Sequence, residues 1–205
     1  MHTQIGIIEN AVWLAFTETK GDALETIFRS IDQVLKETGR TLSEIASVAI
    51  GIGPGSILGL RLSLMALETW RALPQLKHWQ CYAFHGLELQ AQFLRTRSQD
   101  DFHLMSDFRG ESWHLISVVD GVPAPLQIAD DEALKSLPGT LYYSPTGRGR
   151  QKMPRSDTTE AVFSLSKLPA LAPGTWAKKV ETPELYLPSP PVFKKWDAKP
   201  HRGHA

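Results

Sequence analysis

A glycine-rich segment is the part of the chain whose residue types best suit the binding of an anion. Residues 51–56 read Gly-Ile-Gly-Pro-Gly-Ser and separate an apolar stretch from an amphipathic one. Glycine permits positive φ angles and close approach of another group, and the amino terminus of a following helix presents free N–H groups. A phosphate could bind there. The alternative is that the motif serves only a sharp turn and close packing; its residues are Gly51, Gly53, Pro54, Gly55 and Ser56.

Two side chains at this motif have further chemical potential. Arg61 lies one turn into the expected helix and could reach a phosphate or a carboxylate of a partner, but a solvated or locally paired arginine is equally compatible with the sequence. Ser56 is expected to cap the helix rather than to act as a nucleophile, because the elbow pattern Gly-x-Ser-x-Gly is absent. No Gly-Lys-Ser/Thr follows the glycines, so the segment is not a P-loop.

Other polar residues give weaker signals. Asp107, Arg109 and Glu111 form a charged turn between two apolar stretches; we favour a structural turn, with contact to a partner or to tRNA as the alternative. The seven histidines lack the spacing of metal ligands, and Cys81 is the single cysteine of the chain. The sequence therefore predicts neither a metal site nor an internal disulfide.

Hydrophobic periodicity predicts the elements that position these residues. Asp22 and Gly39 mark the two ends of the clearest helix. We expect a hairpin from residues 5–8 and 11–16, helices over 23–38, 57–73 and 86–97, a short helical turn at 41–44, and strands over 47–52, 102–108, 113–119 and 141–144.

Bulk composition excludes several classes of protein. Of 205 residues 42% are hydrophobic, which suffices for a substantial core. The 22 basic residues balance the 22 acidic ones, so there is no global field to attract a polyanion. The chain shows no export signal and no run of 18 apolar residues, and we expect a cytoplasmic protein. We expect an amino-terminal lobe over 1–95, a smaller lobe over 96–196 and a disordered tail over 197–205.

The glycine motif and its flanks resemble a known family. From Gly51 the sequence continues through Gly59 to Arg61 in a pattern similar to the G-x-G-P-G-S-F-T-G-(L/V)-R-(I/V)-G signature of TsaB. Residues 106–113 resemble the family's D-A-R-x-G-E-V-Y segment. Residues 183–187, followed by Lys-Lys-Trp, resemble its P-x-Y-L-R tail. The similarity spans roughly residues 5–196 and is strongest over 41–73.

The resemblance implies an α/β fold, with an actin-like (ribonuclease-H-like) mixed sheet, packed helices and a smaller, degenerate second lobe. Family members begin with a strand of the kind I-L-A-I-D-T-S, whose aspartate lies near the phosphate and metal site of actin-like folds. This chain starts at what looks like the second strand, and Ile57 and Leu58 replace the usual Phe and Thr. The resemblance thus implies no catalytic residue and no metal ligand, and no firmly bound cofactor, with ATP or ADP placed at a partner interface.

The resemblance also implies partners. The family's two long helices form the surface that packs against TsaD, the transferase that places a threonylcarbamoyl group on adenosine 37 of tRNA, or against a second TsaB copy. We therefore expect a non-catalytic subunit that binds a TsaD-type transferase, with a TsaE-type ATPase as a further partner, a homodimer when the partner is absent, tRNA only through the complex, and no membrane. The alternative is that the apolar helix faces serve core packing alone. The expected interface residues are Leu24, Phe28, Ile31, Leu35, Leu60, Leu64, Leu67 and Trp70.

A rival interpretation keeps the same superfamily but assigns an enzyme. In it, the chain is a nucleotide-binding small-molecule kinase or transferase, with Gly53, Gly55, Ser56 and Arg61 around the phosphate. The absence of the acidic first strand argues against this interpretation. Binding of ATP by the isolated chain would distinguish the two.

Overall fold

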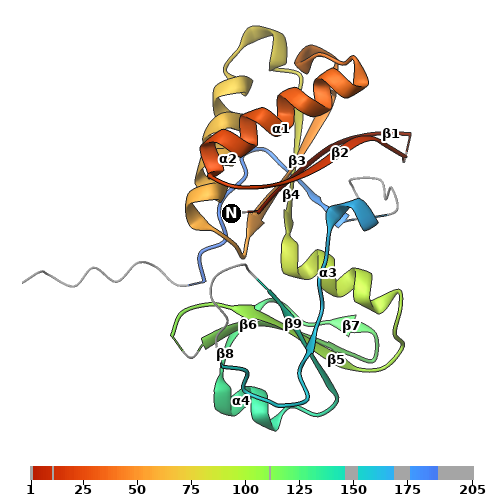
Figure 1. Ribbon diagram of the computed structural model, residues 1–205, viewed down its shortest axis with the longest axis vertical. Helices are drawn as coiled ribbons and strands as arrows, with labels where there is room; N and C mark the ends of the chain where they lie inside the picture. The colour runs from red at the N-terminus through yellow and green to blue at the C-terminus, as the bar shows by residue number, and fades with distance from the viewer. Residues whose placement is uncertain (1, 11, 111, 146–151, 169–175, 189–205) are drawn as a thin grey trace, which may run out of the picture.

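The computed structural model consists of two lobes stacked along the long axis of the molecule, with helix α3 between them (Figure 1). It describes residues 2–10, 12–110, 112–145, 152–168 and 176–188. Within these ranges, no helix combines the length and the apolar character that crossing a membrane requires.

The first lobe contains two separate sheets. Strands β1 and β2 form an antiparallel hairpin, and a three-stranded sheet has the order β11-β4-β3, in which β3 and β4 are parallel. Its elements are β1 (His2–Glu9), β2 (Val12–Lys20), α1 (Ala23–Thr38), η1 (Leu42–Glu44), β3 (Ser47–Gly53), α2 (Ile57–Arg71), η2 (Pro74–Leu76) and β4 (Gln80–His85).

Local sequence signals fix the ends of α1. The Asp22 side chain accepts a hydrogen bond from the Leu24 amide at 2.9 Å, and Gly39 closes the helix in the left-handed conformation with φ 65°. Thr41 and Glu44 form the capping box of the next helical turn. The predicted helix over 23–38 is therefore confirmed. The pairing of β1 with β2 confirms the predicted hairpin.

The second lobe is one sheet with a core on each face. Its strands have the order β10-β9-β5-β6-β7, and β8 also pairs with β6. One face packs Leu104 and Ile116 against Leu87 of α3, and the other packs Trp113 against Leu134 of α4. The elements are α3 (Gly86–Arg95), β5 (Phe102–Asp107), β6 (Ser112–Val119), β7 (Val122–Pro123), β8 (Gln127–Asp130), α4 (Asp131–Ser136), β9 (Thr140–Ser144), β10 (Thr159–Glu160) and η3 (Leu165–Lys167).

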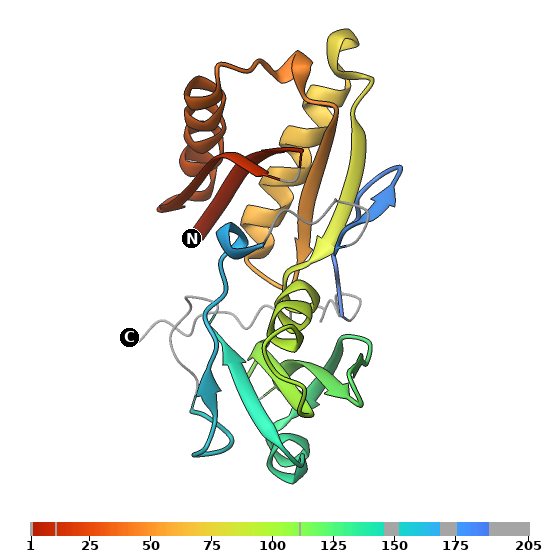
Figure 2. The same cartoon turned by 90° about the vertical axis from the view of Figure 1, so that its right-hand side faces the viewer.

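The predicted division after residue 95 needs two corrections. Helix α3 precedes that boundary, but its buried face packs on the second-lobe sheet. Strand β11 (Lys178–Val180) lies far beyond the boundary, yet it pairs antiparallel with β4 and completes the first-lobe sheet (Figure 2). Residues 197–205 lie outside the described part of the chain.

Candidate functional site

The glycine turn follows β3 at the junction of the two lobes. Gly53 has φ 129°, is buried, and is joined to Pro54 by a cis peptide bond. A Cβ added at Gly53 would lie 3.3 Å from the Cβ of Tyr186. Only glycine suits that conformation and that space. This geometry supports the interpretation in which the glycines allow a sharp turn and close packing.

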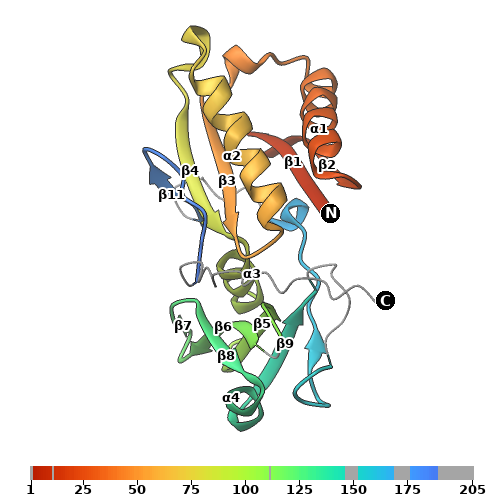
Figure 3. The same ribbon diagram turned by 90° about the vertical axis from the view of Figure 1, so that its left-hand side faces the viewer.

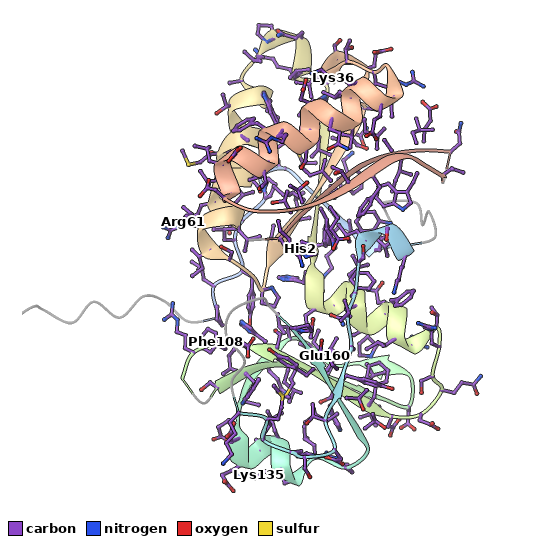
Figure 4. The ribbon with its side chains drawn as sticks, viewed as in Figure 1. His2, Lys36, Arg61, Phe108, Lys135 and Glu160 are labelled. Carbon is purple, nitrogen blue, oxygen red and sulfur yellow. The ribbon has the colours of Figure 1, made fainter. Side chains whose placement is uncertain are left out.

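The residues after the turn begin helix α2. The Ser56 hydroxyl accepts a hydrogen bond from the Gly59 amide at 3.4 Å, and the Ser56 carbonyl accepts one from the Leu60 amide at 2.9 Å. Ser56 is therefore the N-cap of α2, as predicted. Gly59 is buried, whereas Arg61 is exposed on the outer side of α2, where Figure 4 shows its side chain.

A carboxy-terminal segment covers the glycine turn. The Tyr186 amide donates to the Ile52 carbonyl at 2.9 Å, and Arg71 of α2 donates to the Glu181 carbonyl at 2.8 Å. The Tyr186 ring lies between two imidazoles, 5.3 Å from the ring of His85 and 5.6 Å from that of His114. Tyr186 thus connects the end of β4 with β6 of the other lobe.

The residues around Tyr186 form a polar cluster at the junction of the lobes, which we define as His85, Ser106, His114 and Tyr186; His85 and Tyr186 are half-buried. Ser106 and His114 are direct cross-strand partners on β5 and β6, and they are 2% and 5% exposed. The Ser106 hydroxyl and Nδ1 of His85 and His114 have no hydrogen-bond partner among the described residues. Burial lowers the pKa of His114 to about 4, so its imidazole is neutral at pH 7.

The charged turn lies at the edge of this cluster. Phe108 packs on His114 with ring centroids 4.8 Å apart, and the Arg109 guanidinium lies over the Phe108 ring at 5.5 Å. Asp107 accepts a hydrogen bond from the Tyr143 hydroxyl at 2.8 Å. The structure therefore brings the glycine turn and residues 107–109 to opposite sides of one cluster. Glu111 lies outside the described residues.

Sequence reasoning missed the residues that join these two motifs. His85, His114 and Tyr186 come from β4, β6 and the carboxy-terminal segment, and they meet only in the folded chain. The similarity of residues 183–187 to the family's tail pointed to the segment that contains Tyr186, but not to its contacts.

The helical faces predicted as a partner interface divide into three groups. Leu24 and Phe28 of α1 are 54% and 46% exposed. Ile31, Leu35, Leu60, Leu64 and Trp70 are half-buried. Leu67 is 2% exposed and packs in the core with Leu76, Trp79 and Cys81.

The assignment of Leu67 to an interface is accordingly corrected. A wide apolar helix surface does not reveal which stripe faces the core, and the structure places Leu67 in the core stripe. The ring centroid of Trp70 lies 5.9 Å from that of Phe28 and 6.2 Å from that of Trp79. The Trp70 ring therefore joins α1 to the core of the lobe. The exposed apolar residues of α2 are instead Ile57, Leu58 and Met65.

The chemistry of the described side chains gives no metal centre. Among residues that the structure describes, no group of three or more His, Cys, Asp or Glu side chains could hold a metal ion.

Comparison with known proteins finds a family model that matches part of the chain. The family model of TsaD, tRNA N6-adenosine threonylcarbamoyltransferase, matches residues 18–74. These residues run from the end of β2 through α1, β3 and the glycine turn to the end of α2 and the start of η2. No curated protein sequence matches the chain.

Two solved structures share its architecture. An uncharacterized protein with similarity to peptidase YEAZ from Pseudomonas aeruginosa superposes with a TM-score of 0.67 at 17% identity, covering 91% of this chain and 94% of that one. YeaZ from Pseudomonas aeruginosa superposes with a TM-score of 0.59 at 17% identity, covering 80% of each chain. The chain is therefore TsaB-like in its fold, the actin-like α/β fold of YeaZ, and its residues 18–74 match the TsaD family in sequence.

Proposed function

We propose that the chain is a non-catalytic, TsaB-like subunit that binds and stabilises a TsaD-type transferase in the formation of N6-threonylcarbamoyladenosine at adenosine 37 of tRNA. The observation that carries the proposal is that one segment has both the sequence match and the shared fold. Residues 18–74 match the TsaD family model, and the same residues build α1 and α2 of a fold shared with YeaZ.

The surface of α1 and α2 supports this role. Leu24, Phe28, Leu58 and Met65 are between 46% and 63% exposed, and they belong to the two helices within the matched segment. Contiguous patches of exposed apolar side chains commonly mark sites of protein–protein interaction. Burial of such side chains in a partner interface would remove apolar surface from water and so stabilise the complex.

The glycine turn supports a structural role better than a catalytic one. Tyr186 occupies the space beside Gly53. The Ser56 hydroxyl already accepts a hydrogen bond as the cap of α2. Of the residues assigned to phosphate in the rival interpretation, Arg61 is exposed and Gly55 lies on the surface. The same proposal includes three further features. They are ATP or ADP at the interface with the transferase, a TsaE-type ATPase as a further partner, and a homodimer when the transferase is absent.

Co-purification tests the proposal. The chain and the TsaD-type protein of its own organism are co-expressed, and recovery of the complex is measured for the wild type, for Phe28→Glu and for Leu24→Glu. The matched control is Val122→Glu on β7 of the second lobe, because Val122 is 67% exposed and lies outside the matched segment. We expect a complex that both α1 variants lose and the control retains, with all three variants folded.

Two results would contradict the proposal. One is the absence of any complex, together with tight binding of ATP to the isolated chain in calorimetry; this result would favour the kinase or transferase interpretation. The other is a complex that survives both α1 substitutions but is lost on Val122→Glu, which would move the interface to the second lobe.

A further inference from the structure

The second lobe contains a pocket that the proposed function does not use. It has a volume of about 340 Å³, and its lining includes Arg95 and Asp100, from the end of α3 and the residues that follow it. Asp120 and Gly121, which form the turn between β6 and β7, and the buried side chain of Val118 also line it. Figure 3 shows the second-lobe sheet below α3, with α1 and α2 in the other lobe. The pocket is therefore separate from the helical faces that we propose to bind a transferase.

The turn that carries Asp120 has a defined backbone conformation. Asp120 and Gly121 have φ angles of 50° and 70°, in the left-handed region that a two-residue hairpin turn of this kind requires. The Asp101 carboxylate accepts a hydrogen bond from the Asp120 amide at 2.8 Å, which ties the turn to the residue before β5. The backbone thus fixes where the Asp120 side chain leaves the chain.

The guanidinium of Arg95 lies against this turn. A Cβ added at Gly121 would lie 3.2 Å from Nη2 and 3.3 Å from Nε of Arg95. Because Gly121 has no side chain, the planar guanidinium has room beside the backbone of the turn. Arg95 is also the last residue of α3, so its backbone belongs to a regular helix. Both ends of this side chain are therefore positioned at the pocket.

The three charged side chains of the pocket have no charged partner in the described part of the chain. No ion pair within 4.0 Å joins Arg95 to Asp100 or Asp120, and no other described residue bonds to their charged groups. Elsewhere in the same lobe, Arg155 and Asp157 form an ion pair at 2.6 Å. All three charged residues of the pocket are exposed, so a ligand can reach them. The pocket thus offers one guanidinium and two carboxylates to a ligand.

These charges select a class of ligand. A guanidinium binds a carboxylate through two parallel hydrogen bonds, and each aspartate can accept hydrogen bonds from an ammonium group. The buried Val118 supplies apolar surface for a short hydrocarbon chain. The volume of about 340 Å³ lies within the range of small-molecule sites, about 300–1,000 Å³. A molecule with one carboxylate and two ammonium groups matches this set of charges.

We infer that the pocket between α3 and the β6–β7 turn binds a free diamino monocarboxylic acid of the size of lysine or ornithine. Its carboxylate binds Arg95, and its two ammonium groups bind Asp100 and Asp120. A peptide that ends in lysine offers the same carboxylate and one of the two ammonium groups, so the test must separate these two sources.

Titration of the full chain with L-lysine, followed by the amide resonances in NMR, tests the inference. We expect saturable shifts at Ser98 and Gly121, which line the pocket. Norleucine lacks the side-chain ammonium and cadaverine lacks the carboxylate, so each should bind at least about tenfold more weakly than L-lysine. Nα-acetyl-L-lysine represents the end of a peptide and should also bind at least about tenfold more weakly, because it lacks the α-ammonium.

Charge-removing substitutions provide the matched set of variants. We expect Arg95→Gln and Asp120→Asn each to weaken binding of L-lysine about tenfold. Asparagine tolerates the positive φ of residue 120, so the turn is retained. The control is Arg97→Gln, because Arg97 is exposed, lies over the Phe93 ring at 5.6 Å and does not line the pocket. This control should bind L-lysine like the wild type, and the NMR spectra show whether each variant is folded.

Four results would overturn the inference. The first is the absence of saturable shifts at Ser98 and Gly121. The second is equal binding of cadaverine and L-lysine, which would mean that exposed carboxylates attract any amine. The third is Nα-acetyl-L-lysine binding as tightly as L-lysine, which would assign the pocket to the ends of peptides. The fourth is an equal loss of binding in Arg97→Gln and Arg95→Gln. None of these results bears on co-purification with a transferase, so the two proposals fail separately.

Discussion

The ring of Tyr186 lies 5.6 Å from the imidazole of His114, a contact between the carboxy-terminal segment and the second-lobe sheet. The same tyrosine packs on Gly53 and on His85, and its backbone amide bonds to Ile52. One side chain therefore holds the glycine turn of the first lobe against β6 of the second.

Removal of this ring should loosen the junction. Because the Tyr186 ring is half-buried among two imidazoles and a glycine, we expect Tyr186→Ala to lower the free energy of unfolding by about 1–3 kcal/mol. Urea denaturation measures the change. Tyr186→Phe retains the ring and should lie within about 0.5 kcal/mol of the wild type; an equal loss in both variants would disprove the role of the ring.

The buried imidazole of His114 predicts a dependence of stability on pH. Its pKa in the folded chain is about 4, below the ordinary value of 6.5, because burial disfavours the charged form. Between these two pH values the unfolded state binds more protons than the folded state, so the contribution of His114 to stability is present above pH 6.5 and is lost as the pH falls toward 4.

Histidine NMR titration measures this pKa directly. His103 also has a lowered pKa, chiefly through burial, so its titration must be assigned separately. We expect His114→Gln to reduce the dependence of unfolding free energy on pH between 6.5 and 4. An NMR pKa for His114 near 6.5 would contradict the buried, neutral imidazole.

The two glycines on either side of Pro54 should respond differently to alanine. Gly53 has φ 129° and lies against Tyr186, whereas Gly55 is exposed and has no positive φ. We expect Gly53→Ala to destabilise the fold by about 1–3 kcal/mol and Gly55→Ala to change stability by less than about 1 kcal/mol. Thermal unfolding of the two variants checks the difference, and equal effects would refute the packing role of Gly53.

Leucines of the two long helices should separate folding from partner binding. We expect Leu67→Ala to lower the free energy of unfolding by about 2–5 kcal/mol, since Leu67 is in the core, and Leu24→Ala to lower it by less than about 0.5 kcal/mol, since Leu24 is 54% exposed. Urea denaturation gives both values. A large loss for Leu24→Ala would show that this residue supports the fold rather than an interface.

Local signals account for what the sequence predicted well. Asp22 and Gly39 bracket α1, and Ser56 starts α2, because capping depends on residues within one turn of the helix end. The helices predicted to end at residues 73 and 97 end at Arg71 and Arg95. The short helix α4 was not predicted, although Asp130 caps it by accepting a hydrogen bond from the Ala133 amide.

Contacts between distant residues account for what the sequence did not predict. Nothing near Lys178 indicates that β11 pairs with β4, and nothing near Gly86 indicates that α3 packs on the second-lobe sheet. Leu67 and Leu24 are both leucines on amphipathic helices, and only the folded chain shows that one is covered and the other exposed. The cluster around Tyr186 likewise depends on three segments that are far apart along the chain.

The pairing of β11 with β4 also sets an order of events during synthesis. The ribosome makes β3 and β4 early, but their sheet receives its third strand only after residues 178–180 have emerged, when all of β5 to β9 is already made. The second lobe can therefore complete its sheet before the third strand of the first-lobe sheet has been synthesised. The sheet of the first lobe thus needs a strand that is synthesised after every strand of the second lobe.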